Sequence, residues 1–176
     1  MADFNLTQCI GLASFGLATI TYSNAARQNS ACDEPNRRCW LILSALYAIL
    51  FLELIANTRH SALRKIGLIL GLGDQYEYRR PLQLFIIVVT TIIVLCLIAK
   101  LYKVILDLPL VGLSLLIAAF SVILFFIEII SLHQLDAILY ARIGTIMVIG
   151  CFWLVLGLTA SAIALANIPT PSKRIE

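Results

Sequence analysis

The fold class is decided by one long apolar stretch, residues 81–132, which reads PLQLFIIVVTTIIVLCLIAKLYKVILDLPLVGLSLLIAAFSVILFFIEIISL. A transmembrane helix needs about 20 mostly apolar residues to cross a hydrocarbon core of about 30 Å. This stretch is too long for one such helix, and polar residues interrupt it only between Lys100 and Pro109. It therefore predicts two helices, residues 81–105 and 109–132, joined by a tight turn.

Prolines and lysines agree with the positions of these two helices. Pro81 and Pro109 each suit a first helical turn, because proline lacks the backbone donor that a helix start leaves unpaired anyway. Lys100 and Lys103 then lie near the end of the first helix, where long basic side chains reach the membrane interface.

The rest of the chain has the composition of a membrane protein. Of 176 residues, 61% are hydrophobic and 13% charged, with a mean hydropathy of +0.96, whereas a soluble domain carries about 25% charged residues. Further apolar runs predict helices over about residues 4–22, 39–56 and 143–166. We therefore expect an all-α integral membrane helical bundle with five transmembrane helices, forming a single membrane domain over residues 1–176.

Loop 2, residues 57–80, contains a short amphipathic piece. Within it, residues 61–72 carry Arg64 and Lys65 among leucines and isoleucines, and are too few to span a bilayer. Such a segment is expected to lie along the membrane as a short interfacial helix. The apolar run at residues 4–22 has no basic residue before it and no convincing cleavage site after it, which favours a retained helix over a signal peptide.

An odd number of spans places the N-terminus, loop 2 and loop 4 on one side of the membrane. Six Lys and Arg residues fall on this side and seven on the other, so the positive-inside rule leaves the orientation open. Five of the six lie in loop 2, which favours a cytoplasmic first side. On the other side, Cys32 and Cys39 could form a disulfide, which needs an oxidising compartment, or could remain two unpaired thiols.

The polar residues best suited to binding or catalysis lie on the first side. The candidate ligand- or partner-binding residues are Arg79, Arg80, Gln83, Glu128, Ser131, His133 and Asp136. If the helix continues past residue 128, Glu128 with Ser131 and His133 with Asp136 are neighbours three residues apart. Ionisable groups at membrane depth are costly and point to function. For Glu128 the alternative is a structural ion pair with an arginine.

Several ligands suit this group of residues. His60, His133 and Asp136 would make a divalent metal site of the kind that a metal-dependent membrane hydrolase needs. Alternatively, the two histidines would ligate a haem whose propionates are held by Arg79 and Arg80. Binding of a quinone or a lipid headgroup is chemically simpler, because it requires only donors beside an apolar wall.

Small residues within the helices favour close packing over chemistry. Gly112, Gly144, Gly150 and Gly157 fit close helix contacts. Cys9, Cys96 and Cys151 are expected to be small apolar packing residues.

Two stretches resemble a known group of sequences. Tyr76-Glu-Tyr-Arg79-Arg80-Pro-Leu-Gln83 and Ser131-Leu-His133-Gln-Leu-Asp136 are similar to the Tyr-x-x-Arg-Arg-x-x-Gln and Ser-x-His-x-x-Asp motifs of uncharacterised small bacterial multi-pass membrane proteins. The resemblance implies a bacterial inner membrane and draws attention to the same side of the membrane. It implies no activity.

The sequence favours a non-enzymatic membrane subunit, scaffold or sensor that binds a partner protein, quinone or anionic lipid. One alternative is a component of a homo-oligomeric channel or transporter, and another is an intramembrane metal- or haem-dependent enzyme. No cofactor is predicted for the leading interpretation. Membrane lipids and other membrane subunits, or further copies of the chain, are the expected partners. The net charge of +3 is spread over loops and gives no case for nucleic acid.

Overall fold

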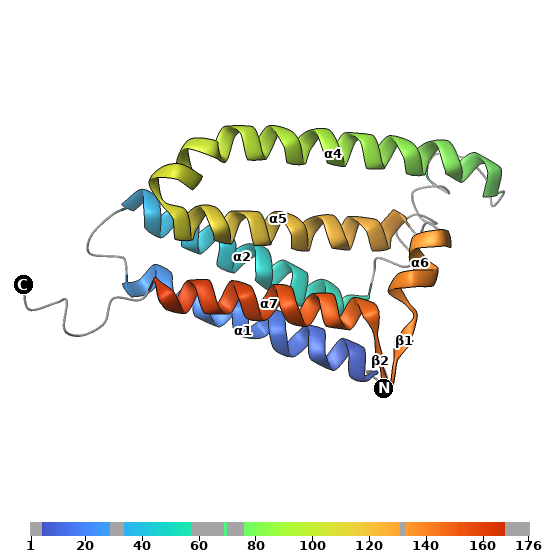
Figure 1. Cartoon of the computed structure of the whole chain (residues 1–176), viewed down its shortest axis with the longest axis horizontal. Helices are drawn as coiled ribbons and strands as arrows, with labels where there is room; N and C mark the ends of the chain where they lie inside the picture. The colour runs from blue at the N-terminus through green and yellow to red at the C-terminus, as the bar shows by residue number, and fades with distance from the viewer. Residues whose placement is uncertain (1–4, 29–33, 58–68, 70–75, 131–132, 168–176) are drawn as a thin grey trace, which may run out of the picture.

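The apolar runs fold into long helices that alternate in direction along the chain (Figure 1). The computed structural model describes residues 5–28, 34–57, 69, 76–130 and 133–167. The long helices are α1 (Leu6–Gln28), α2 (Glu34–Ala56), α4 (Tyr76–Asp107), α5 (Pro109–Ile130) and α7 (Val148–Ala166). Between α5 and α7 lie the short helix α6 (His133–Leu139) and a hairpin of β1 (Arg142–Ile143) and β2 (Ile146–Met147).

The expectation of an all-α helical bundle is confirmed. Three of the helices are long and apolar enough to cross a membrane, over Asn36–Ala56, Pro109–Glu128 and Val148–Ala166. The expected interfacial helix at residues 61–72 lies outside the described residues, apart from Ile69.

The helices extend further than the apolar runs that predict them. Helix α1 continues to Gln28 instead of ending near residue 22, α2 begins at Glu34 instead of residue 39, and α4 begins at Tyr76. Polar residues with good helix propensity prolong a helix beyond its membrane-compatible part. Pro81 is therefore inside α4 and not in its first turn, whereas Pro109 is the first residue of α5 as expected.

The predicted start of the last helix at residue 143 is wrong, because a hairpin occupies residues 142–147. Arg142 pairs with Met147 and Ile143 with Ile146, leaving Gly144 and Thr145 as a two-residue turn. Gly144 has a φ of +66°, which glycine adopts without strain at the first position of such a turn. Nothing lies within 4 Å of a Cβ built there, so Gly144 serves the turn and not helix packing.

Local hydrogen bonds define the ends of α1 and α2. Asn5 and Gln8 form a capping box, in which the Gln8 N–H donates to Asn5 Oδ1 at 2.8 Å and the Asn5 N–H donates to Gln8 Oε1 at 3.3 Å. Asn57 ends α2 in the left-handed conformation, with φ of 51° and its N–H donating to the Glu53 carbonyl at 2.7 Å.

Helices α1 and α7 pack through small residues at heptad spacing. The buried positions of α1 are three or four residues apart and include Thr7, Gly11, Ser14, Ala18, Thr21 and Ala25. Those of α7 follow the same spacing and include Gly150, Trp153, Gly157, Ala160 and Ala164. This pattern is typical of a left-handed coiled contact, and small side chains let the two backbones approach closely.

Six aromatic rings fill the centre of the bundle. The Tyr22 ring lies 5.6 Å from Trp40 and 5.4 Å from Tyr47, measured between centroids. Phe15 continues the series, with its centroid 5.7 Å from Tyr47 and 5.8 Å from Phe125. Phe125 in turn lies 6.2 Å from Trp153. The rings come from α1, α2, α5 and α7, and they hold these four helices around one core.

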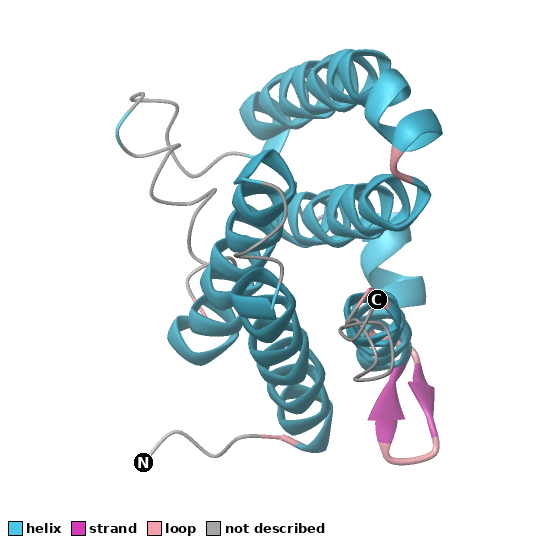
Figure 2. Ribbon diagram, turned by 90° about the vertical axis from the view of Figure 1, so that its left-hand side faces the viewer, coloured by secondary structure: helices cyan, strands magenta, loops and turns pink. Residues whose placement is uncertain are grey.

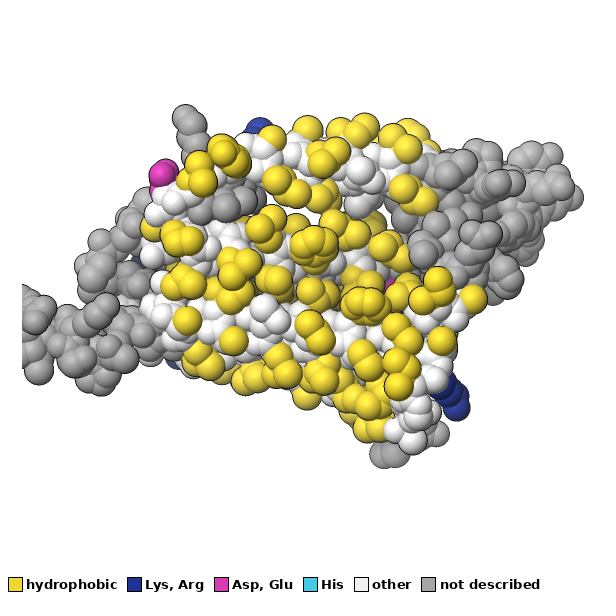
Figure 3. Space-filling view, viewed as in Figure 1, with side chains coloured by type: hydrophobic (Ala, Val, Ile, Leu, Met, Phe, Trp, Pro, Cys, Tyr) yellow, Lys and Arg dark blue, Asp and Glu magenta, His cyan; other side chains and the backbone are white. Residues whose placement is uncertain are grey.

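The bundle carries polar side chains inside and large apolar side chains outside. The buried polar residues are Thr7, Ser14, Thr21, Ser114, Ser121, Glu128 and Ser161. Apolar side chains dominate the face drawn in Figure 3, and Ile42 and Val155 are 64% and 61% exposed. Soluble proteins place these residue types the other way round. An apolar surface of this extent marks contact with something other than water.

Helix α4 lies at the edge of the bundle and packs chiefly against α5 (Figure 2). All its described side chains are half-buried or exposed, and nearly all are apolar. It is therefore apolar around its circumference without being enclosed by protein.

Candidate functional site

The site is built on the buried face of α5. Ser114, Ser121 and Glu128 lie seven residues apart on this face, and each is at most 1% exposed. Seven residues of α-helix rise about 10.5 Å, so the three polar groups form a column about 21 Å long. Val111 before them and Ala118 and Phe125 between them complete the heptad pattern of the buried face.

Two polar groups of the column, Ser121 and Glu128, each meet a tyrosine hydroxyl from a different part of the chain. The Tyr47 hydroxyl of α2 is 3.1 Å from Ser121 Oγ. Because Ser121 Oγ donates its own proton to the Ile117 carbonyl at 3.0 Å, the tyrosine is the donor in this pair. The hydroxyls of Ser114 and of Tyr22 in α1 are both buried and have no hydrogen-bond partner among the described residues. The column therefore ties α2 to α5 inside the apolar core through the Tyr47–Ser121 bond.

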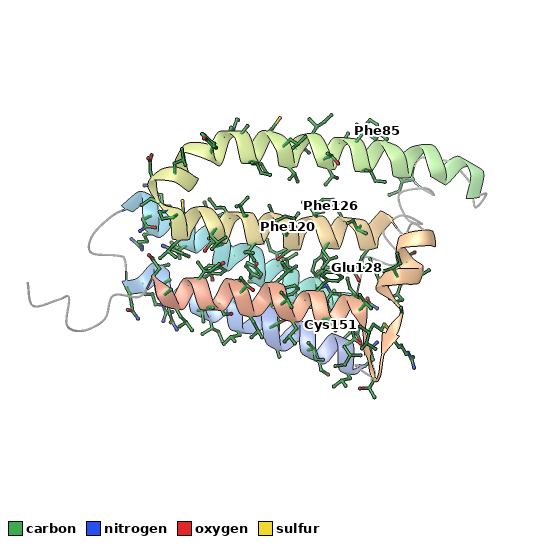
Figure 4. The ribbon with its side chains drawn as sticks, viewed as in Figure 1. Phe85, Phe120, Phe126, Glu128 and Cys151 are labelled. Carbon is green, nitrogen blue, oxygen red and sulfur yellow. The ribbon has the colours of Figure 1, made fainter. Side chains whose placement is uncertain are left out.

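At the far end of the column, Tyr140 donates a hydrogen bond to Glu128 Oε1 at 3.5 Å. Tyr140 follows α6, so the bond connects the end of α5 with the segment that leads into the hairpin. Figure 4 labels Glu128 at the end of α5 nearest α6. The carboxyl group is thus buried beneath a folded cap formed by α6 and the hairpin.

The cap is joined to α1 and α7 by backbone bonds. The Met147 N–H donates to Thr7 Oγ1 at 3.1 Å, and the Val148 N–H donates to the Ala141 carbonyl at 3.0 Å. These two bonds use backbone donors that the first turn of α7 leaves unpaired. The hairpin therefore fixes the position at which α7 begins beside α1.

The structure places the predicted binding residues at this end of the bundle. Arg79, Arg80 and Gln83 lie in the first turns of α4, and His133 is the first residue of α6. The side chains of these four residues are outside the described part. Asp136, also in α6, is half-buried. Ser131 lies outside the described residues.

The metal and haem hypotheses remain predictions. Among the residues that the structure describes, no three His, Cys, Asp or Glu side chains lie together as a metal site would require. His60 is outside the described residues, and so is the side chain of His133.

The cysteines differ in their surroundings. Cys39 is a free, half-buried thiol in α2, and Cys32 lies outside the described residues, so their pairing stays a prediction. Cys9 and Cys96 are exposed on the outer surface, so the packing role predicted for them is wrong, whereas Cys151 is half-buried.

The tyrosines are the members of the site that sequence reasoning missed. The heptad spacing of Ser114, Ser121 and Glu128 is visible in the sequence. Tyr47 and Tyr140 give no comparable signal, because each comes from a different part of the chain and joins the column only through tertiary packing.

Comparisons with family models, with curated proteins and with solved structures found no match to the chain.

Proposed function

We propose that the chain is a non-enzymatic integral membrane protein that crosses the bilayer five times and binds a partner through its α6 end. The observation that carries the membrane part is the inverted polarity of the bundle, with Ser114, Ser121 and Glu128 inside and apolar side chains outside. In water this surface would promote association, whereas in lipid it is solvated.

Helices α1 and α4 complete the proposed set of five spans. With 23 and 32 residues they measure about 34 and 48 Å at about 1.5 Å per residue, enough to cross a core of about 30 Å. The polar residues of α1 that weaken its hydropathy, such as Ser14 and Thr21, face other helices. Its exposed large side chains, including Leu17 and Ile20, are apolar.

The alternating helices collect the predicted binding residues at one end. Helices α1, α4 and α7 begin there and α2 and α5 end there, as can be followed in Figure 1. We assign this end to the cytoplasmic side, on the ground that loop 2 concentrates basic residues.

The cap at this end is built to present a surface and not to form a channel through one subunit. Glu128 and Thr7 connect it to α5 and α1, so α6 is held in one position on the bundle. The interior behind it is occupied by the aromatic rings from Phe15 to Trp153. A cap that hydrogen bonds hold on an apolar bundle suits a subunit that docks a second protein, and Arg79, Arg80, His133 and Asp136 are its proposed contacts.

The proposal is tested by native gel electrophoresis of mild detergent extracts from the source membrane. A variant in which Arg79, Arg80, His133 and Asp136 are all changed to Ala should lose the higher-mass complex that the wild type forms. The control changes Arg27 and Arg37, exposed basic residues at the opposite end, to Ala and should retain it. An unchanged complex in the fourfold variant would contradict the proposed role of the α6 end.

A further inference from the structure

A groove runs between α4 and the two helices beside it. It has a volume of about 340 Å³ and is lined by Leu43 and Leu46 of α2, Val94 and Leu97 of α4, and Ala118 and Ala119 of α5, among others. A second groove of about 210 Å³ lies along the same pair of helices, α4 and α5. Thr90, Val94 and Phe126 border both grooves. Figure 3 shows a hollow between the side chains of these two helices, and Figure 4 labels Phe126 on α5 beside it.

The lining of the larger groove suits a hydrocarbon chain. Apart from Thr90, every residue that lines it is apolar. An acyl chain has no hydrogen-bonding groups of its own, so it can lie against such a lining without leaving a polar group unpaired.

The length of the groove matches one leaflet of a bilayer. Along α4 its lining runs from Thr90 to Ile98, a rise of about 12 Å at 1.5 Å per residue. Half of a hydrocarbon core of about 30 Å is about 15 Å. An acyl chain of one leaflet would thus follow the groove over most of its length.

Two basic residues mark the end of the groove at which a headgroup would lie. Lys100 follows the lining residues Ile93 and Leu97 on the same face of α4, at seven and three residues' distance. Arg38 precedes the lining residue Ile42 on α2 by four residues. Both basic side chains are exposed, and the end of α4 and the start of α2 lie at the same end of the bundle (Figure 1).

The only described acidic side chain further along α4 does not cancel this charge. Asp107 lies seven residues beyond Lys100, about 10.5 Å further toward the end of the helix. The mouth of the groove therefore combines an apolar slot with two basic side chains, Lys100 and Arg38.

We propose that this groove is a phospholipid site, in which an acyl chain lies between α2, α4 and α5 and an anionic headgroup contacts Lys100 and Arg38. The site rests on the proposed membrane location but not on the partner at the α6 end. Such a lipid would cover the inner side of α4 and connect it to α2, which it otherwise contacts little.

The experiment measures lipid binding to delipidated full-length protein by native mass spectrometry, with mixed micelles of phosphatidylglycerol or phosphatidylcholine as probes. Wild type should bind one phosphatidylglycerol with a preference of roughly 30-fold over phosphatidylcholine, from about 1 kcal/mol for each basic residue. Lys100→Gln with Arg38→Gln should remove that preference. Arg27→Gln, an exposed charge at the end of α1, is the matched control and should keep it.

Filling the groove tests the acyl chain directly. Ala119→Phe should weaken binding of both lipids at least tenfold, whereas Ala162→Phe on the exposed face of α7 should leave it unchanged. Ala119→Leu is a milder second variant, and helical circular dichroism checks that each variant folds.

Two results would overturn the proposal. One is wild-type lipid binding by folded Ala119→Phe. The other is that the wild type is a dimer, that Ala119→Phe is a monomer, and that both bind lipid equally. The groove would then hold part of a second copy of the chain. Neither result affects the membrane location itself, which alkaline extraction of the membranes tests separately.

Discussion

Gly157 of α7 lies against the backbone of Ser14 in α1. A Cβ atom at Gly157 would be 2.6 Å from Ser14 Cβ and 2.8 Å from its carbonyl carbon. The Ser14 hydroxyl in turn donates to the Trp153 carbonyl at 3.1 Å, a bond between the two helices. Contact this close requires a residue without a side chain, so the position of α7 beside α1 depends on Gly157.

Changing Gly157 to Ala should therefore destabilise the protein, although alanine is the better helix former. Backbone atoms of Ser14 cannot move aside as a flexible side chain would, and overpacking of this kind costs about 1–3 kcal/mol. The measurement is thermal unfolding in detergent, followed by circular dichroism. Gly16→Ala is the matched control, because its nearest atom, on Phe51, is 3.4 Å away. Equal stability of the two variants would show that α1 and α7 are not in backbone contact.

The Tyr47 and Ser121 hydroxyls, 3.1 Å apart, should show a measurable coupling energy. Hydrogen bonds between membrane helices average about 0.6 kcal/mol in double-mutant cycles and reach about 1.7 kcal/mol. A cycle with Tyr47→Phe and Ser121→Ala should give a value in this range. The control is a second cycle that combines Tyr47→Phe with Ser161→Ala. The Ser161 hydroxyl donates to the Gly157 carbonyl within its own helix, so no coupling with Tyr47 is expected. Equal coupling in both cycles would argue against the bond.

Gly144→Val should weaken the cap through backbone conformation alone. No atom lies within 4 Å of the added Cβ, but a β-branched residue is strained at a φ of +66°. The expected loss is about 1–2 kcal/mol, with faster proteolysis of the hairpin. Gly144→Asn should retain most of the stability, because asparagine tolerates this region better. If valine and asparagine behave alike, the turn is not in the left-handed conformation.

Much of the helical arrangement follows from the sequence, because length and apolarity alone predict helices in lipid. Pro109 marks the start of α5 as a missing backbone donor predicts. The hairpin was not predicted, although Gly144-Thr145 between Ile143 and Ile146 is a turn signal. A search for long apolar runs does not detect a strand of two residues, because the apolar run continues past it.

The candidate site is less accessible to sequence reasoning. The spacing of Ser114, Ser121 and Glu128 predicts one polar stripe on α5, but nothing local specifies whether it faces lipid, water or protein. Tyr47, the partner of Ser121, is 74 residues away in the chain. Their pairing depends on how α2 packs against α5, which only the three-dimensional structure gives.

The membrane account is tested most directly by the accessibility of single cysteines in a variant that lacks the five native ones. Thr145→Cys in the hairpin and Leu108→Cys between α4 and α5 are both at exposed positions, at opposite ends of the bundle (Figure 1). A membrane-impermeant maleimide is applied to intact cells and to inverted vesicles. The account predicts that each cysteine is labelled from one side only and that the two sides differ. Labelling of both cysteines from the same side would contradict it.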